Sequence, residues 1–133
     1  ITVDYNWQSA VRTLVLSDVT SLGERPSFAA AIARQPMSKP GKFTIDYSIS
    51  PLTVPYVSAR DLLDGKFASL KGKTVVIGLN ADQLGDQYWL PGYGKMAGAY
   101  IHIIGAETLK KGSVTNLHWW PAVLLALLAC AAA

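Results

Sequence analysis

Thr74-Val75-Val76-Ile77-Gly78 is an uninterrupted, mostly β-branched run that ends in glycine, and it decides the fold that we expect. A run without polar alternation is typical of a strand buried on both faces, as in a parallel sheet covered by helices. A long loop follows over 79–96, and Gly98 then precedes residues with apolar positions at helical spacing, up to Gly112. Strand, loop and helix in this order form half of a βαβ unit. The sequence therefore predicts an α/β fold, a mainly parallel or mixed sheet with flanking helices.

Shorter elements are predicted upstream of this unit. Ser27 is a suitable N-cap for a run of good helix formers. Ser58 and Asp61 have capping-box spacing and open a second, short helix. Polar and apolar residues alternate, or aliphatic residues cluster, in the segments expected to be strands. The expected elements are strands over 1–7, 11–19 and 43–49 and helices over 27–35 and 58–65.

The C-terminal stretch has the composition of a membrane helix. From Trp119 to Ala133 no side chain carries a charge, an amide or a hydroxyl group. Two tryptophans begin the stretch, as in an interfacial aromatic belt, and Pro121 suits a first helical turn. A full crossing needs about 20 apolar residues. We expect residues 118–133 to be the truncated start of a transmembrane helix after a globular region over 1–117. The alternative is a buried C-terminal helix of a soluble domain.

Charge and cysteine content argue against several classes of function. The 12 Lys and Arg residues are interleaved with acidic residues, so the net charge of +3 indicates a solvated surface and no nucleic-acid partner. The single cysteine, Cys130, lies in the apolar run, which leaves no disulfide framework and no cysteine metal site. The glycine spacing of dinucleotide-binding and P-loop motifs is missing after Gly78, and no cofactor is expected.

A candidate site follows the predicted strand. Asp82 and Asp86 lie where open α/β sheets bind ligands, and His102 on the next helix can join them in a polar or cation site. The alternative is that the aspartates cap turns and that His102 is a hydrogen-bonded core residue. Two carboxylates without a clear third ligand do not predict a metal site. Tyr88 and Trp89 are a candidate binding wall, or they shield a protein or lipid contact.

The helix start suggests a coupling between two of these residues. Gly98 is expected to allow a close backbone approach, with His102 about one turn further along the helix. Asp86 can reach the same neighbourhood from the loop. A contact between this carboxylate and the imidazole would favour charged His102 and make the junction pH-sensitive near neutrality.

The order of the central motifs resembles a known family. SARDLLDG, LKGKTVVIG, LGDQYWLPG and MAGAYIHI are followed by a helix and an apolar run. From about Val11 onward this order resembles the second type of CHASE domain (cyclases/histidine kinases-associated sensory extracellular). Leu90 and Ile103 depart from the family, where Thr and Ala are common at these places. The positions that match, including the structural glycines and proline, are Ser58, Lys71, Gly72, Lys73, Val75, Val76, Ile77, Gly78, Asp86, Pro91, Met96, Gly98 and His102.

The resemblance implies a non-enzymatic input domain of a bacterial receptor in the inner membrane. Residues 1–117 would be the C-terminal part of a sensory domain that faces the periplasm or the cell exterior. The output module would be a nucleotide or diguanylate cyclase, a phosphodiesterase or a histidine kinase. Expected partners are an unknown small-molecule or physical signal, the membrane, and a second receptor copy in a homodimer. The alternative is a soluble α/β ligand-binding or enzyme domain.

Overall fold

The computed structural model describes residues 3–5, 10–36, 40–67, 69–80, 85–112 and 120–131. In chain order its elements are β1 (Val3–Tyr5), β2 (Val11–Val15), β3 (Ser17–Thr20), β4 (Gly23–Pro26), α1 (Phe28–Ile32), β5 (Lys42–Thr44), the 3-10 turn η1 (Pro51–Thr53), α2 (Ala59–Leu63), β6 (Gln87–Leu90), β7 (Gly94–Ala97), α3 (Gly98–Lys111) and α4 (Trp120–Ala131). β1 and β5 flank β2 in an antiparallel three-stranded sheet, while β3–β4 and β6–β7 are separate antiparallel hairpins.

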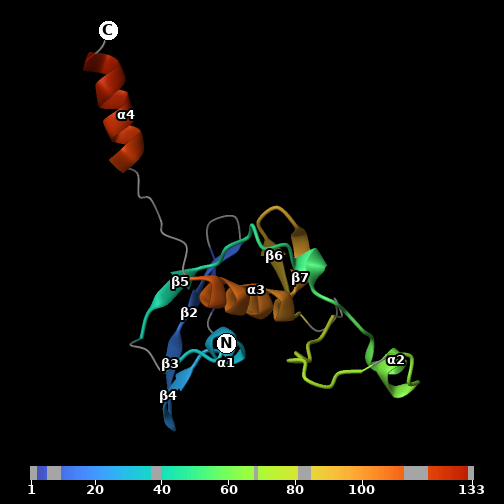
Figure 1. Cartoon of the computed structure of the whole chain (residues 1–133). Helices are drawn as coiled ribbons and strands as arrows, with labels where there is room; N and C mark the ends of the chain where they lie inside the picture. Colours follow the sequence, from blue (N-terminus) through green and yellow to red (C-terminus); the bar gives the residue numbers. More distant parts are fainter. Residues whose placement is uncertain are drawn as a thin grey trace.

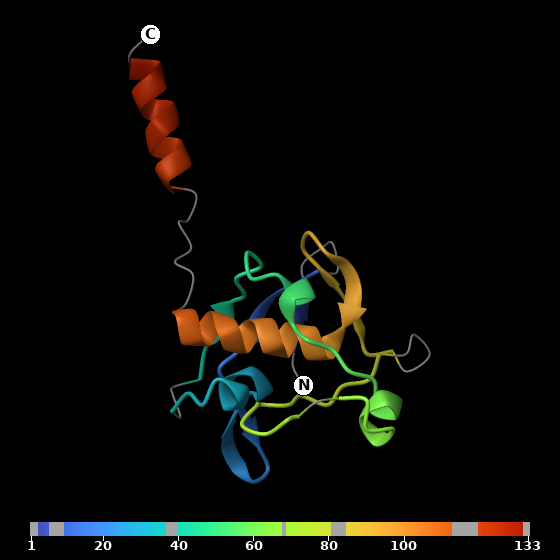
Figure 2. The ribbon, with the colours of Figure 1, turned by 45° about the vertical axis from the view of Figure 1, so that its right-hand side comes forward.

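The helix α3 is the centre of the molecule. Figures 1 and 2 show α1 beneath it and the β6–β7 hairpin at its N-terminal end. Gly105 allows α3 to approach the sheet, because a Cβ at this position would lie 2.6 Å from Cδ1 of Leu14 on β2. The side chains buried around this contact form the core; they are Val11, Leu14, Ala29, Phe43, Ile45, Leu90, Ile101 and Ile104.

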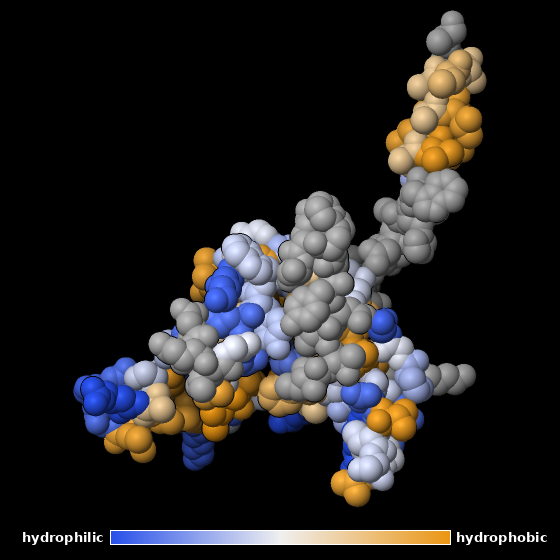
Figure 3. Space-filling view, turned by 180° about the vertical axis from the view of Figure 1, so that it is seen from behind, coloured by the Kyte–Doolittle hydropathy of each residue, from blue (hydrophilic) through white to orange (hydrophobic). Residues whose placement is uncertain are grey.

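The prediction of a buried parallel strand at Thr74–Gly78 is wrong. Residues 73–80 form no strand, and no strand pair among the described residues includes them. Ile77 is 93% exposed. Apolar surface, orange in Figure 3, is exposed on the globular part of the molecule seen from behind. β-Branched residues favour an extended backbone, but a strand also needs a hydrogen-bonded neighbour, which the described residues do not provide. The sheets of the described residues are antiparallel, unlike the mainly parallel or mixed sheet that the sequence predicts. The coarser prediction of an α/β fold is confirmed.

The helix boundaries agree better with the sequence. The Ser27 hydroxyl accepts a hydrogen bond from the Ala30 amide and begins α1. At α2 the Ser58 hydroxyl accepts from the Asp61 amide, which confirms the N-cap, and it donates to the Asp61 carboxylate. Of the expected strand over 43–49, only its beginning is a strand, β5, whereas 11–19 divides into β2 and β3 at Leu16.

The β6–β7 hairpin was not expected from the sequence, which predicts a loop over 79–96. Its turn has Pro91 and Gly92 at the two central positions, with Gly92 at φ +81° and the Tyr93 amide donating to the Leu90 carbonyl. This is the residue pattern of a type II turn. The flanking strands have four residues each and alternate only weakly in polarity, so the period-two pattern is too short to recognise.

The last element, α4, lies apart from the other helices and strands in both ribbon views (Figures 1 and 2). Pro121 occupies its first turn, as expected. Its apolar side chains face outward; those exposed are Val123, Leu124, Leu125, Leu127 and Leu128. In the part of the chain that the structure describes, no helix has the length and apolar content needed to cross a membrane, so the predicted transmembrane span is not confirmed.

Candidate functional site

The first turn of α3 brings three of the sequence-predicted residues together. The Asp86 carbonyl accepts a hydrogen bond of 2.9 Å from the Gly98 amide, which joins the start of β6 to the helix. A Cβ on Gly98 would lie 2.5 Å from Oδ1 of Asp86 and 2.8 Å from Cε2 of Tyr88. Gly98 therefore admits the close approach expected from the sequence, and the Asp86 carboxylate lies against the helix N-terminus. Negative charge is favoured there because the first amides of a helix point outward.

His102 is buried one turn beyond this contact, with 8% of its surface exposed. Its ring meets the ring of Phe28 on α1 edge to face, with centroids 5.2 Å apart and an interplanar angle of 67°. Its Nδ1 atom is buried and has no hydrogen-bond partner among the described residues. Burial lowers the pKa of His102 below 6.5, and the attraction of Asp86 opposes this without overcoming it. Asp86 thus favours the charged form of His102, as expected from the sequence, but desolvation is the larger effect and the net shift of the pKa is downward.

The other candidates lie elsewhere. Tyr88 is half-buried beside Gly98, whereas Trp89 is 56% exposed and pairs across the hairpin with Lys95. Successive strand residues point to opposite faces, so these two aromatic residues do not form one binding wall. Asp82 lies outside the described residues, and its predicted role stays a prediction.

The glycines and the proline of the family motif lie in different parts of the structure. Gly72 has φ +75°, a left-handed conformation that a glycine adopts without a steric cost. A Cβ on Gly78 would lie 2.5 Å from Cβ of Ala99, so the exposed segment 73–80 touches α3 at this glycine. Pro91 lies in the β6–β7 turn.

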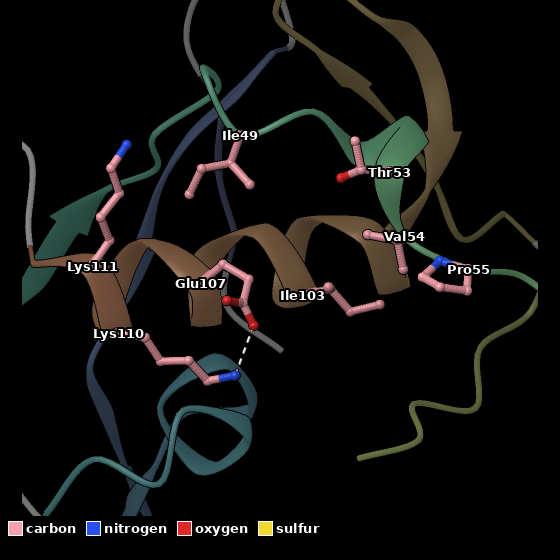
Figure 4. Close-up of a pocket in the computed structure, with 8 residues that line it drawn as sticks. All are labelled: Ile49, Thr53, Val54, Pro55, Ile103, Glu107, Lys110 and Lys111. Atoms are coloured by element: carbon pink, nitrogen blue, oxygen red, sulfur yellow. Dashed lines mark hydrogen bonds and ion pairs between the residues drawn. The ribbon is translucent and has the colours of Figure 1, made fainter. Parts of the chain in front are cut away.

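A groove on the opposite half of α3 was not predicted from the sequence. It has a volume of about 680 Å³ and lies between α3 and the segment 49–55 (Figure 4). Apolar side chains line its wall toward the middle of the helix, and charged ones surround its C-terminal end. The lining residues are Ile49, Thr53, Val54, Pro55, Ile103, Glu107, Lys110 and Lys111.

The charges at the end of the groove neutralise each other. Lys110 donates to the Glu107 carboxylate at 2.7 Å, and Lys111 donates to the Asp46 carboxylate at 2.9 Å. Hydrogen bonds from Ser48 and Lys111 lower the pKa of Asp46 to about 2. The Glu107–Lys110 spacing is a signal that a helical reading can find. Asp46 and Lys111 are 65 positions apart, and no local pattern relates them.

Two chemical capacities follow from these sites. His102 can take up a proton within the α1–α3 contact, and the groove can hold an apolar body beside paired charges. Within the residues that the structure describes, no group of three or more His, Cys, Asp or Glu side chains is arranged to hold a metal ion.

Comparison with known proteins identifies the chain at the level of family. The family model described as the CHASE2 domain matches residues 3–133. No curated protein and no solved structure matches the chain. CHASE2 domains are extracellular sensory domains without catalytic activity of their own. Because the match covers nearly the whole length, the chain belongs to the CHASE2 domain family.

Proposed function

We propose that this chain is the periplasm-facing input domain of a bacterial inner-membrane receptor, and that α4 begins the helix that enters the membrane. The observation that carries the proposal is the family match over residues 3–133, which includes both the globular part and α4. The receptor's output module is then a cyclase, a phosphodiesterase or a histidine kinase on the other side of the membrane.

α3 is the element suited to carry a signal. It contacts the Asp86 carboxylate at its N-terminal end and lines the groove along its second half. It ends at Lys111, shortly before α4 begins at Trp120. A ligand or proton that favours one placement of α3 by a few kcal/mol shifts the receptor between two states. The chemistry required of the domain is therefore binding and not catalysis.

The surface of α4 supports the membrane part of the proposal. Leu125 is 68% exposed and Leu127 63% exposed, on a helix without a charged side chain. A continuous apolar surface of this kind is covered by lipid or by another protein in the working molecule. A lipid environment covers all sides of such a helix at once.

A topology experiment tests the proposal. Alkaline phosphatase is active only after export, so we expect a fusion at Pro40 of the full-length receptor to be active. The same enzyme fused in the output module is the control and is expected to be inactive. A stable but inactive fusion at Pro40, with activity in the output module, would reverse the topology and remove the proposed function.

A further inference from the structure

The α1–α3 contact contains a histidine that is placed to respond to acid. His102 is 8% exposed and lies on the face of α3 that meets α1. Its Nδ1 atom has no partner among the described residues. A neutral imidazole tolerates such a position, whereas an imidazolium carries a second N–H donor and a charge that need water or an acceptor.

The surroundings of His102 offer little compensation for a positive charge. α1 has the sequence Phe-Ala-Ala-Ala-Ile and no ionisable group. The neighbours of His102 one turn away on α3 are alanine or glycine; they are Gly98, Ala99, Gly105 and Ala106. Around the helix start the titratable groups are Asp86 and Tyr88, and Lys95 on β7 is exposed at the surface. Asp86 is thus the one anionic group described near the ring, and its attraction is weaker than the effect of burial.

The element that covers His102 is short, and the buried side chains Ala29 and Ala30 hold it to the core. α1 has only five residues, and isolated helices of that length are not stable in water. Phe28, whose ring contacts the imidazole, is itself 45% exposed. One aromatic ring at the molecular surface therefore separates His102 from solvent on this side. A displacement of Phe28 would expose this face of the imidazole to water.

We propose that acidification is a signal for this domain: a proton taken up by His102 releases α1 from α3. The site then has two states, a closed one with neutral His102 under Phe28 and an open one with hydrated, charged His102. The opening itself is independent of the proposed receptor function, but its role as a signal rests on it.

The pH window follows from the sign of the pKa shift. In the closed state the pKa of His102 lies below 6.5, its value when solvated. The closed state therefore keeps its full stability above pH 6.5 and loses stability as the pH falls toward the lowered pKa. Each unit by which the pKa of His102 is lowered in the closed state corresponds to about a tenfold increase in the ratio of open to closed molecules at acidic pH. Replacing Asp86 removes the attraction that stabilises charged His102 in the closed state. The increase of the open state at acidic pH therefore becomes larger.

Hydrogen exchange of the α1 amides, corrected for intrinsic rates, measures the opening. For the whole chain in detergent micelles we expect protection of α1 to fall, by up to about tenfold, between about pH 7.5 and about pH 5.5. The fall should disappear in His102→Gln and become larger in Asp86→Asn. The matched control is His118→Gln, which removes the other histidine of the chain and should leave the fall unchanged.

The outcomes separate the two claims. Unchanged protection in the wild-type chain, or an equal loss in His102→Gln, overturns the switch. If His102→Gln does not fold, the NMR titration of His102 in the wild-type chain decides, since a midpoint at or above 6.5 also overturns it. A receptor whose output ignores pH although α1 opens in the isolated chain would instead contradict the signalling role.

Discussion

At the scale of single residues, the geometry of the site depends on glycine at position 98, which has no side chain. Gly98 lets the Asp86 carboxylate and the Tyr88 ring approach the first turn of α3. The sequence indicates this approach, because a glycine stands where a loop must meet a helix start. It does not indicate the charge state of His102. That state depends on burial beneath Phe28, a residue 74 positions earlier in the chain, which no local pattern reveals.

The contact at Gly98 leads to a mutational prediction. Gly98→Ala places a Cβ 2.5 Å from Oδ1 of Asp86, so residues must shift. The better helix propensity of alanine returns up to about 1 kcal/mol, whereas overpacking costs about 1–3 kcal/mol. We expect the free energy of unfolding in urea to fall by about 1–2 kcal/mol. In an Asp86→Ala background, Gly98→Ala should lower the free energy of unfolding by less, because the carboxylate that the new Cβ would meet is gone. An equal loss in both backgrounds would show that the two residues do not meet.

At the scale of elements, the helices follow the sequence more closely than the strands do. The caps at Ser27 and Ser58 are local interactions between residues three positions apart, and both are present. A strand is completed by a partner that is distant in the chain. The run Thr74–Gly78 has the strongest local preference for strand and yet has no paired neighbour among the described residues, whereas the weakly patterned β6 and β7 pair with each other through a favourable turn.

Two isoleucines test this difference with the same substitution. Ile77 is 93% exposed in the segment 73–80, and Ile101 is 1% exposed on α3. We expect Ile101→Ala to lower the free energy of unfolding by about 2–5 kcal/mol, because it leaves a cavity in the core. Ile77→Ala should change it by less than about 0.5 kcal/mol, as is usual at a surface position. Chemical denaturation of both variants measures these values. Similar losses would mean that Thr74–Gly78 is buried in solution, as its sequence pattern indicates.

At the scale of the whole molecule, one helix joins every part that has a candidate role. Gly105 of α3 packs against the sheet, and His102 of α3 contacts α1. Ile103 of the same helix lines the groove. Its hydrophobic spacing makes α3 predictable as a helix, and the apolar run makes α4 predictable in the same way. How the layers assemble around α3 is not predictable, because contacts such as Asp46–Lys111 join residues 65 positions apart. The α/β class therefore follows from the sequence, whereas the antiparallel sheets and the groove do not.

The exposed surface of α4 gives a prediction for the whole molecule. The 12 residues of this helix extend about 18 Å, less than the hydrocarbon layer of about 30 Å, but without a charge they favour insertion into lipid. We expect the full chain to float with liposomes in a density gradient, whereas the chain ending at Gly112 should stay in the aqueous fraction.

The control keeps the length of the helix and changes only its polarity. Leu124 and Leu128 lie one turn apart on α4 and are 50% and 59% exposed. A lysine at the centre of a membrane helix costs about 3 kcal/mol, so replacing both leucines by lysine should abolish flotation. If the lysine variant floats like the wild-type chain, another surface holds the protein on the vesicle. If the wild-type chain remains monomeric in the aqueous fraction, α4 is not a lipid-seeking helix and the link from α3 into the membrane fails.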